Sequence, residues 1–577
     1  MNGGEIAARV IAAHKVDALF TLIGGHVSPI LVESKKRGIR VIDTRHEVNA
    51  VFAADAWARL KGIPGVAVVT AGPGVTNTIT AVRNALMAQS PLVLIGGATA
   101  TALRGRGSLQ DIDQIELIRC SVKKALRVNK LTDIAPMLNN AFATAAAGVP
   151  GPVFVEIPVD LLYEDKIVRD WYADASPKGK SFMARIIRGY LKFHVARLFQ
   201  GAAKIRIPET KKNPPHFVSD NLLARIAAAI DKAERPLVLA GSQVLRDARV
   251  ANDVRAALEK LGIPVYLSGM ARGLLGEKHP LQYRQKRKEA LKECDLVILL
   301  GVPADFRLNY GAHIGRHAYQ VNVNLDRKDL KKNKRPNIAA RVDSATLLLR
   351  LAEKGIFADE AKLAAWKQTL TEREKVREAE ILGSATEKMK LVNPVDFFRK
   401  ATPVLAKKTI LVADGGDFVA TGAYTLRPGG PLTWLDPGVF GTLGVGAGFA
   451  LGAKVARPDH DVVILYGDGS AGYSIMEFDT FVRHKLPIGA IIGNDACWTQ
   501  IYRDQVEFLK DDVACMLDYS HYDEIAQTFG GKGMTISKPA QIKTGLNALK
   551  NSLKKKQPFI LNVLIGRSEF RKGSISM

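Results

Sequence analysis

The stretch that decides the fold is DVVILYGDGS at residues 461–470, followed by IGAIIGND at residues 488–495. Each stretch is a run of apolar residues that ends on glycine and then on an oxygen-bearing side chain, Asp468 in the first and Asn494 in the second. A helical pattern over residues 475–484 separates the two runs, which predicts a strand–helix–strand unit with parallel strands. Because neighbouring parallel strands end at the same sheet edge, Asp468 and Asn494 are expected to lie close together.

The residue types at these two strand ends suit a metal ion and a diphosphate. Carboxylate and amide oxygens are hard ligands, and Mg²⁺ usually binds through one or two protein groups together with phosphates. Glycines on either side of Asp468 would let the backbone approach a diphosphate closely. A GDG triplet alone is typical of an ordinary turn, but the second polar strand end, 26 residues after Asp468, makes the prediction specific.

Short apolar runs alternate with helical patterns in three parts of the chain, residues 1–165, 217–350 and 393–577. This alternation predicts an α/β protein with three doubly wound parallel-sheet domains. Between them, residues 166–216 are predicted to be a basic amphipathic linker, and residues 351–392 a helical connector of mixed charge.

Composition excludes several classes of protein. The four cysteines are far apart and the histidines show no HExxH pattern, so neither a disulfide scaffold nor a thiolate zinc site is expected. No apolar run is long enough for a transmembrane span. The 577 residues carry 82 Lys and Arg against 57 Asp and Glu, a net charge of +25, which favours an anionic partner, although solubility explains the excess equally well. No helix-turn-helix, zinc-finger or RNP pattern accompanies the charge, so nucleic acid is not expected as the partner.

Part of the charge lies in the linker. Residues 166–216 hold 12 Lys and Arg and 3 Asp and Glu, and within them SFMARIIRGYLKFHVARLFQ, residues 181–200, has apolar residues at helical spacing with cations between them. Such a helix can lie in a membrane interface, cover a channel for an amphiphilic ligand, or pack on the core of its own protein.

The two strand-end motifs together resemble the signature of thiamine-diphosphate-dependent enzymes, in which GDG is followed, one strand later, by a pair of Asn. The chain departs from it at Gly493, which stands where the first Asn is expected. The resemblance implies three protein ligands for Mg²⁺: Asp468, Asn494 and the backbone carbonyl of Ala496. It also implies contacts to thiamine diphosphate from Gly467, Asp468, Gly469, Ser470 and Asn494.

The N-terminal part carries a second resemblance. DTRHEVNAVFAADAWARLKG, residues 43–62, is similar to the segment in which these enzymes place a glutamate against N1′ of the cofactor aminopyrimidine, and this role falls on Glu47. The carboxyl group would favour the imino tautomer, whose N4′ then removes the C2 proton of the thiazolium. Taken alone, Glu47 is also explained as an acidic residue stabilised by a helix N-terminus.

Further segments fit the same family. Gly25 in GGHVSPIL would lie near the substrate oxyanion, and Gln110 matches an active-site glutamine. DGGDF, with Asp414, Gly415 and Gly416, would flank the diphosphate, and Leu443 would hold the cofactor in its bent shape. The many glycines are explained equally well by close packing of helices on sheets.

The chain most resembles the acetolactate-synthase-like and 2-hydroxyacyl-CoA lyase branch, which implies a carbon–carbon lyase that cleaves 2-hydroxyacyl-CoA in the manner of fatty acid alpha-oxidation. The alternatives are an acetolactate-synthase-type carboligase for 2-keto acids and, in another class, a non-catalytic membrane- or nucleotide-binding protein. RKDLKKNKR, residues 327–335, has six basic residues that could meet the phosphates of coenzyme A, although a solvated loop explains them too. The resemblance leaves FAD open as a non-catalytic occupant of the middle domain.

The resemblance also implies a homodimer or homotetramer in which Glu47 of one chain meets Asp468 and Asn494 of its partner. Members of the branch carry an N-terminal anchor in the endoplasmic reticulum membrane. No anchor is found in this sequence, so a soluble, cytoplasmic or peripheral location is the alternative, with peripheral contact expected through residues 181–200.

Overall fold

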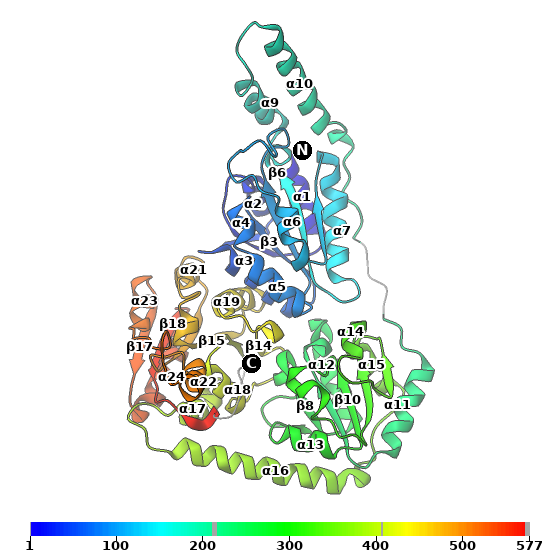
Figure 1. Ribbon diagram of the computed structural model, residues 1–577, viewed down its shortest axis with the longest axis vertical. Coiled ribbons are helices and arrows are strands. Elements are labelled where there is room, and N and C mark those ends of the chain that lie inside the picture. The colour runs from blue at the N-terminus through cyan, green and yellow to red at the C-terminus, as the bar shows by residue number, and fades with distance from the viewer. Residues whose placement is uncertain (1, 211–215, 406–407, 572–577) are drawn as a thin grey trace. The chain divides into compact units, whose positions relative to one another are not determined.

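The structure is a computed structural model that describes residues 2–210, 216–405 and 408–571 (Figure 1). It contains three six-stranded sheets, and every strand pair within them is parallel. The chain divides into two compact units, one around the first sheet and one that holds the second and third sheets. The predicted α/β class with three parallel sheets is confirmed; the predicted domain boundaries stay a prediction.

The first sheet has the strand order β2-β1-β3-β4-β6-β5. Its strands are β1 (Ala18–Leu22), β2 (Arg40–Asp43), β3 (Gly65–Val69), β4 (Leu92–Ala98), β5 (Lys124–Arg127) and β6 (Pro152–Pro158). The helices of this part are α1 (Gly3–Ala13), α2 (Ser28–Lys36), α3 (Glu47–Lys61), α4 (Pro73–Thr76), α5 (Ile79–Met87), α6 (Gln114–Ile118), α7 (Ile134–Ala146), α8 (Val159–Leu162), α9 (Asp165–Asp174) and α10 (Phe182–Leu198). Strands β3, β4 and β6 are buried along their whole length, which explains their continuous apolar runs.

The second sheet has the order β12-β11-β10-β7-β8-β9, the order of dinucleotide-binding folds. Its strands are β7 (Pro236–Ala240), β8 (Val265–Leu267), β9 (Gln282–Tyr283), β10 (Leu296–Leu300), β11 (Tyr319–Val323) and β12 (Ile338–Ala340). The helices are α11 (Asp220–Lys232), α12 (Ala251–Leu261), α13 (Arg287–Glu293), α14 (Arg327–Leu330) and α15 (Ser344–Glu353). The long helix α16 (Glu360–Thr386) follows in the region predicted as a polar connector, and it buries Leu363, Trp366 and Leu370 on one side.

The third sheet repeats the strand order of the first, β14-β13-β15-β16-β18-β17. Its strands are β13 (Thr409–Ala413), β14 (Trp434–Leu435), β15 (Asp461–Gly467), β16 (Ile488–Asn494), β17 (Lys532–Ile536) and β18 (Phe559–Leu564). The helices are α17 (Pro394–Leu405), α18 (Asp417–Thr425), α19 (Val445–Ala456), α20 (Asp468–Ala471), α21 (Glu477–Arg483), α22 (Thr499–Leu509), α23 (Tyr522–Thr528) and α24 (Ile542–Lys554). Side chains of α17, α18 and α24 pack with β13, β15, β16 and β18 in one apolar core.

Helices α9 and α10 form a hairpin that extends away from the first sheet (Figure 1). Helix α10 coincides with the predicted amphipathic segment. In the described part of the chain, every helix is too short or too polar to cross a bilayer.

Candidate active site

The ends of β15 and β16 bring Asp468 and Asn494 to one edge of the third sheet. Gly467 pairs with Gly493 across the two strands, so the next residue of each chain segment, Asp468 and Asn494, lies at the same end of the sheet. Both side chains are buried. The carboxylate of Asp468 accepts hydrogen bonds from the backbone N–H of Gly469 at 2.8 Å and of Cys497 at 3.2 Å, so the segment after β16 folds back onto the end of β15. Burial raises the pKa of Asp468.

Ala496 lies in this returning segment and has a φ of +52°. A residue with a Cβ rarely adopts this conformation, and such strain gathers at functional sites. Its N–H donates to Oδ1 of Asn494 at 3.3 Å, which holds the turn. The Asp468 carboxylate, the Asn494 amide oxygen and the Ala496 carbonyl are hard oxygen donors of the kind that Mg²⁺ prefers. Among the described residues there is no group of three or more His, Cys, Asp and Glu able to hold a metal ion.

Packing accounts for the departure at Gly493. A Cβ at this position would lie 2.1 Å from Cγ of Phe418 and within 2.5 Å of both neighbouring ring carbons. Phe418 is itself buried in the core below the site. The chain has exchanged the side chain expected at this position for close packing of α18 on β16.

Asp495 lies next to Asn494 but is not among the site residues predicted from the sequence. It is buried, and the hydroxyl of Thr499 donates to it. Burial, and then the charge of Asp468, raise its pKa to about 7. The residue stands inside the quoted motif, directly after Asn494, so the signal was present in the sequence.

The glycine turns of the third sheet pack against one another beside Asp468. The N–H of Gly467 donates to the carbonyl of Gly415 at 3.2 Å, and the hydroxyl of Ser470 donates to the same carbonyl at 3.1 Å. A Cβ on Gly415 would lie 2.1 Å from Cδ2 of Leu443, so Leu443 lies against this turn. Gly416 has a φ of +106°, which a side chain would strain. The structure therefore joins these predicted residues in one cradle.

Asp414 fixes the second wall of the cradle. Its two carboxylate oxygens accept hydrogen bonds from the N–H of Gly444 at 2.9 Å and of Gly446 at 2.6 Å. Burial raises its pKa to about 7, against these two hydrogen bonds, which lower it. Asp414 thus connects the end of β13 to the start of α19 and holds Leu443 between them. On the other side, a Cβ on Gly469 would lie 2.6 Å from the ring of Trp498.

Glu47 belongs to the unit of the first sheet, where it begins α3. It is buried, and Nδ2 of Asn77 donates to its Oε2 at 2.9 Å. A Cβ on Gly74 would lie 3.8 Å from the other oxygen, Oε1, so a glycine-lined turn faces this oxygen. Nδ1 of His46 lies 3.9 Å from Oε2.

The other predicted residues of this unit surround the same turn. A Cβ on Gly72 (φ +60°) would lie 2.9 Å from Cβ of Gln110, which places Gln110 against the turn. Thr70 lies beside Gly74, and its hydroxyl shares a hydrogen bond with Nδ1 of His26 at 3.1 Å. The preceding residue, Gly25, accepts a hydrogen bond at its carbonyl from the hydroxyl of Tyr163 at 2.9 Å. The loop of Gly25, the loop of Gln110 and Glu47 therefore meet the turn between β3 and α4.

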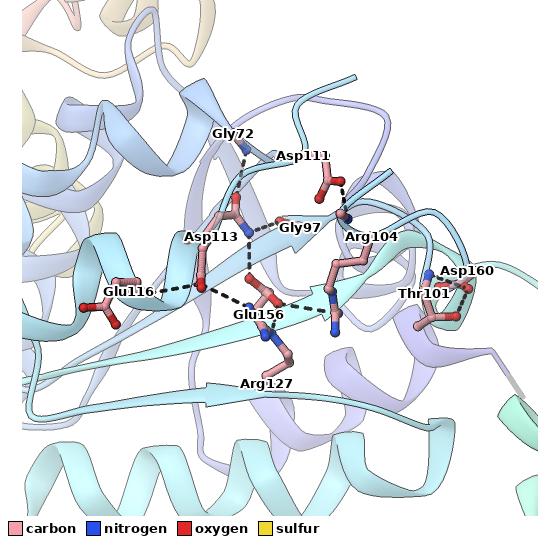
Figure 2. Close-up of polar contacts among 12 residues, drawn as sticks. Gly72, Gly97, Thr101, Arg104, Asp111, Asp113, Glu116, Arg127, Glu156 and Asp160 are labelled. Atoms are coloured by element: carbon pink, nitrogen blue, oxygen red, sulfur yellow. Dashed lines mark hydrogen bonds and ion pairs between the residues drawn. The ribbon is translucent and has the colours of Figure 1, made fainter. Parts of the chain in front are cut away.

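A buried polar network behind this turn was missed from the sequence. Gln114, at the start of α6, accepts from the N–H of Gly72 at 2.8 Å and donates to the carbonyl of Gly97 at 3.0 Å. It also donates to Glu156 of β6 at 3.1 Å. Figure 2 shows Arg104 and Arg127 both directed at Glu156, with Arg127 Nε donating at 2.6 Å. No sequence signal separates Gln114 from an ordinary helix-start residue.

A basic cavity of about 460 Å³ lies in the unit of the second and third sheets. It is lined by residues of β8, β9, α13, α16, α18 and β14. Besides His313, its wall contains six cationic side chains and one carboxylate, Glu289. The cations are Arg272, Arg284, Lys286, Arg287, Lys288 and Arg377.

Carboxylates compensate part of the charge of this cavity, since Arg377 pairs with Glu380 at 2.6 Å. Arg272 donates to the backbone carbonyl of Ala423 at 2.8 Å and Arg287 to that of Arg307 at 3.0 Å. Within the described ranges, neither guanidinium forms an ion pair with a carboxylate. Burial, and then the charge of Arg272, lower the pKa of Arg287. Crowded cations in a cavity favour an anionic ligand.

The basic run at residues 327–335 takes a different place. It forms α14 and the turn after it, where Lys332 pairs with Asp329 at 2.6 Å and Lys334 Nζ donates to the carbonyl of Ile314 at 3.0 Å. None of its residues is among those that line the basic cavity. The run at residues 327–335 and the basic cavity are therefore two separate concentrations of positive charge, and a role of the run in binding coenzyme A stays a prediction.

Comparison with known proteins agrees with this geometry. The models of thiamine pyrophosphate enzymes match in three parts: the N-terminal TPP binding domain at residues 1–117, the central domain at 223–351 and the C-terminal TPP binding domain at 414–563. The chain is 48% identical to "2-hydroxyacyl-CoA lyase 2" of Danio rerio and 46% identical to that of Homo sapiens, over 100% of this chain and 93% and 92% of theirs. It is 32% identical to a "Probable acetolactate synthase" of Mycobacterium bovis, over 98% of this chain and 96% of that protein. The chain belongs to the thiamine pyrophosphate enzyme family, and it is similar over its full length to both 2-hydroxyacyl-CoA lyases and acetolactate synthases.

Proposed function

We propose that the chain is a thiamine-diphosphate- and Mg²⁺-dependent lyase that cleaves a 2-hydroxyacyl-CoA into an aldehyde one carbon shorter and formyl-CoA. The observation that carries the proposal is the shared edge of β15 and β16, where Asp468 and Asn494 lie at neighbouring strand ends beside a glycine cradle. Full-length similarity to proteins named 2-hydroxyacyl-CoA lyase 2 supports the substrate class.

In this proposal the third sheet holds the diphosphate and its metal ion. Asp468, Asn494 and the carbonyl of Ala496 would bind Mg²⁺, which would in turn bind the phosphates. The backbone of Gly415, Gly416, Gly467, Gly469 and Ser470 would approach the diphosphate. Asp414 would act indirectly, because it fixes the segment that carries Leu443.

The first sheet would hold the pyrimidine end and control its protons. When bound, thiamine diphosphate supplies a nucleophilic carbon and an electron sink. Asn77 holds Oε2 of Glu47, which leaves Oε1 to share a proton with N1′ of the aminopyrimidine. Gln110 and Gly25 border the same turn and would orient the reacting carbonyl. Family architecture implies that Glu47 works with the third sheet of a partner chain, in a homodimer or homotetramer.

The basic cavity favours the coenzyme A ester over the runner-up, an acetolactate-synthase-type carboligase for 2-keto acids. A keto acid brings one carboxylate, which a single guanidinium can bind, whereas coenzyme A brings several phosphate charges. The cavity reaches Tyr424 at the end of α18, and the cradle lies at the start of that helix. Nine helical residues rise about 12 Å, so one substrate arm would have to span that distance.

Two further features stay proposals. The strand order of the second sheet suits a dinucleotide, which supports FAD as a non-catalytic occupant. The relatives' branch suggests the endoplasmic reticulum membrane as location, with a cytoplasmic or peripheral location as the alternative. A purely binding role is disfavoured by the full-length similarity to proteins named 2-hydroxyacyl-CoA lyase 2.

The test is product analysis on the purified protein. A 2-hydroxyacyl-CoA is supplied with and without thiamine diphosphate and Mg²⁺, and pyruvate is supplied in a parallel reaction. We expect equal amounts of aldehyde and formyl-CoA only when both cofactors are present. If pyruvate gave acetolactate and the thioester gave no aldehyde, the synthase function would replace the lyase function. If neither substrate gave a product, both proposed functions would be wrong.

A further inference from the structure

The outward side of α10 is an exposed apolar surface with basic neighbours. Six large apolar side chains on this helix are exposed, Phe182 and Phe193 by 78% and 67%. Phe182, Ile186, Tyr190 and Phe193 follow one another at intervals of three or four residues, so they share one side of the helix. We call this set, with Met183 and Ile187, the outer face of α10.

The helix docks on its own unit through a different side. Ala184, Val195 and Leu198 are buried, and Leu191 packs against the cluster of Val168, Tyr172 and Val195. This inner stripe accounts for the helix as part of a folded unit. It does not explain the outer face, which an ordinary soluble helix would make polar.

Cations flank the outer face without acidic partners. Arg185, Arg188 and Lys192 form a third stripe at helical spacing. Residues 176–206 contain eight Lys and Arg and no Asp or Glu. In the described part of the chain, none of the cations of α10 forms an ion pair with a carboxylate. Three of the four cations of α10, Arg185, Lys192 and Arg197, are exposed.

We propose that the outer face of α10 docks into the interface of an anionic lipid bilayer, with the aromatic and aliphatic side chains among the acyl chains and the cations at the headgroups. Charge selects this occupant. A second copy of the chain would bring two sets of cations together with no carboxylate between them. A lone acyl chain gives no reason for the flanking cations.

A buried network ties the docking helix to the loop that carries Gln110. His194 on α10 shares a hydrogen bond with the hydroxyl of Thr101 at 2.7 Å. Asp160, fully buried, accepts from that hydroxyl at 2.5 Å and from the N–H of Thr101 at 2.9 Å (Figure 2). It also accepts from the hydroxyl of Tyr172 at 2.8 Å. A bilayer-bound α10 would therefore hold one end of this loop in place. Bilayer docking itself does not depend on the proposed lyase activity.

The test uses co-sedimentation of the full chain with phosphatidylcholine vesicles, with and without phosphatidylserine. We expect binding to the serine-containing vesicles and its loss in high salt. Phe182→Ser with Phe193→Ser, and separately Arg185→Glu with Lys192→Glu, should each lower the affinity at least about tenfold. Lys543→Glu with Lys550→Glu, two exposed lysines on α24, is the charge-matched control and should bind as the unchanged chain does.

Phe357→Ser, which removes an apolar side chain exposed by 67% elsewhere, is the control for hydrophobic loss. Thermal unfolding of each variant shows that it is folded, so loss of binding is not loss of structure. Failure of the unchanged chain to bind anionic vesicles overturns the inference, and so does full binding by the α10 variants. A change in oligomeric state of the Ser variant in vesicle-free buffer, with unchanged vesicle binding, would assign the outer face to a second copy instead.

Discussion

Replacing Gly493 by alanine tests whether packing dictates the unusual glycine beside the candidate metal ligand. The new methyl carbon would lie 2.1, 2.4 and 2.5 Å from three ring carbons of Phe418. Carbon atoms prefer separations of about 3.5–4.0 Å, so the ring would have to retreat by about 1.5 Å. It has no room, because the ring of Phe398 lies 4.4 Å away between centroids and Phe418 is 3% exposed.

Overpacking of this kind costs about 1–3 kcal/mol in free energy of unfolding. In a domain of 150–250 residues, each kcal/mol lowers Tm by about 2–4 °C. Phe418 belongs to α18, whose first residue follows Gly416, so the retreat should also disturb the cradle. We expect Gly493→Ala to lower both Tm and the affinity for thiamine diphosphate with Mg²⁺.

Thermal unfolding followed by circular dichroism, repeated with the cofactor and Mg²⁺, measures both effects. Gly472→Ala is the matched control, because a Cβ there would lie 3.4 Å from its nearest neighbour, the carbonyl oxygen of Gly469. Phe418→Leu should recover part of the loss in the Gly493→Ala background, and a double-mutant cycle gives the size of the coupling. If Gly493→Ala unfolds at the same temperature as Gly472→Ala, the packing explanation is wrong.

Four further outcomes are expected. Glu47→Gln should lower kcat at least about 100-fold at saturating cofactor without lowering Tm, and full turnover would remove the role given to this carboxyl group. Asp468→Asn should raise the Mg²⁺ concentration needed for cofactor-induced thermal stabilisation, whereas an unchanged midpoint would contradict metal binding. Arg287→Ala should raise KM for the acyl-CoA about tenfold or more and leave KM unchanged for the matching thioester that lacks the nucleotide; equal effects on both would place the phosphates elsewhere. Because the folded-state pKa of Asp414 is raised to about 7, the native state binds a proton that the unfolded chain releases near pH 4. The free energy of unfolding should therefore fall as the pH rises from about 4 to 7, and this slope should be weaker in Asp414→Asn. An equal slope in both proteins would contradict this expectation.

The sheet arrangement and the adjacency of the strand-end residues are predictable from the sequence, because local pattern and chain geometry determine them. Apolar strands joined by helices can form only a few arrangements, and parallel neighbours end at one edge. The adjacency of Asp468 and Asn494 followed from this rule and needed no side-chain detail. The glycines of the cradle were found through resemblance, and their contacts with Leu443 and Ser470 depend on the same strand ends.

Residues whose importance depends on distant partners could not be found this way. Gln114 and Glu156 are 42 residues apart and meet only because β6 lies beside β4. The basic cavity takes four of its six cations from the run RQKRK at residues 284–288, but Arg272, Arg377 and the lining residues of α18 and β14 come from distant parts of the chain. The compact run at residues 327–335 looked stronger in sequence because its charges are adjacent, but its lysines bond to nearby backbone and to Asp329.

The strand order of the first and third sheets determines when each sheet can be completed during synthesis of the chain. In each, the strand made last lies inside the sheet: β6 inserts between β4 and β5, and β18 inserts between β16 and β17. In the part of the chain that the structure describes, β17 pairs with β18 alone. The third sheet is therefore still incomplete when the ribosome has just made β17. Asn494 itself pairs with Leu564 of β18. A nascent chain stopped before Phe559 would therefore expose the edge of β16, with the strand that carries Asn494 open to pairing with other chains.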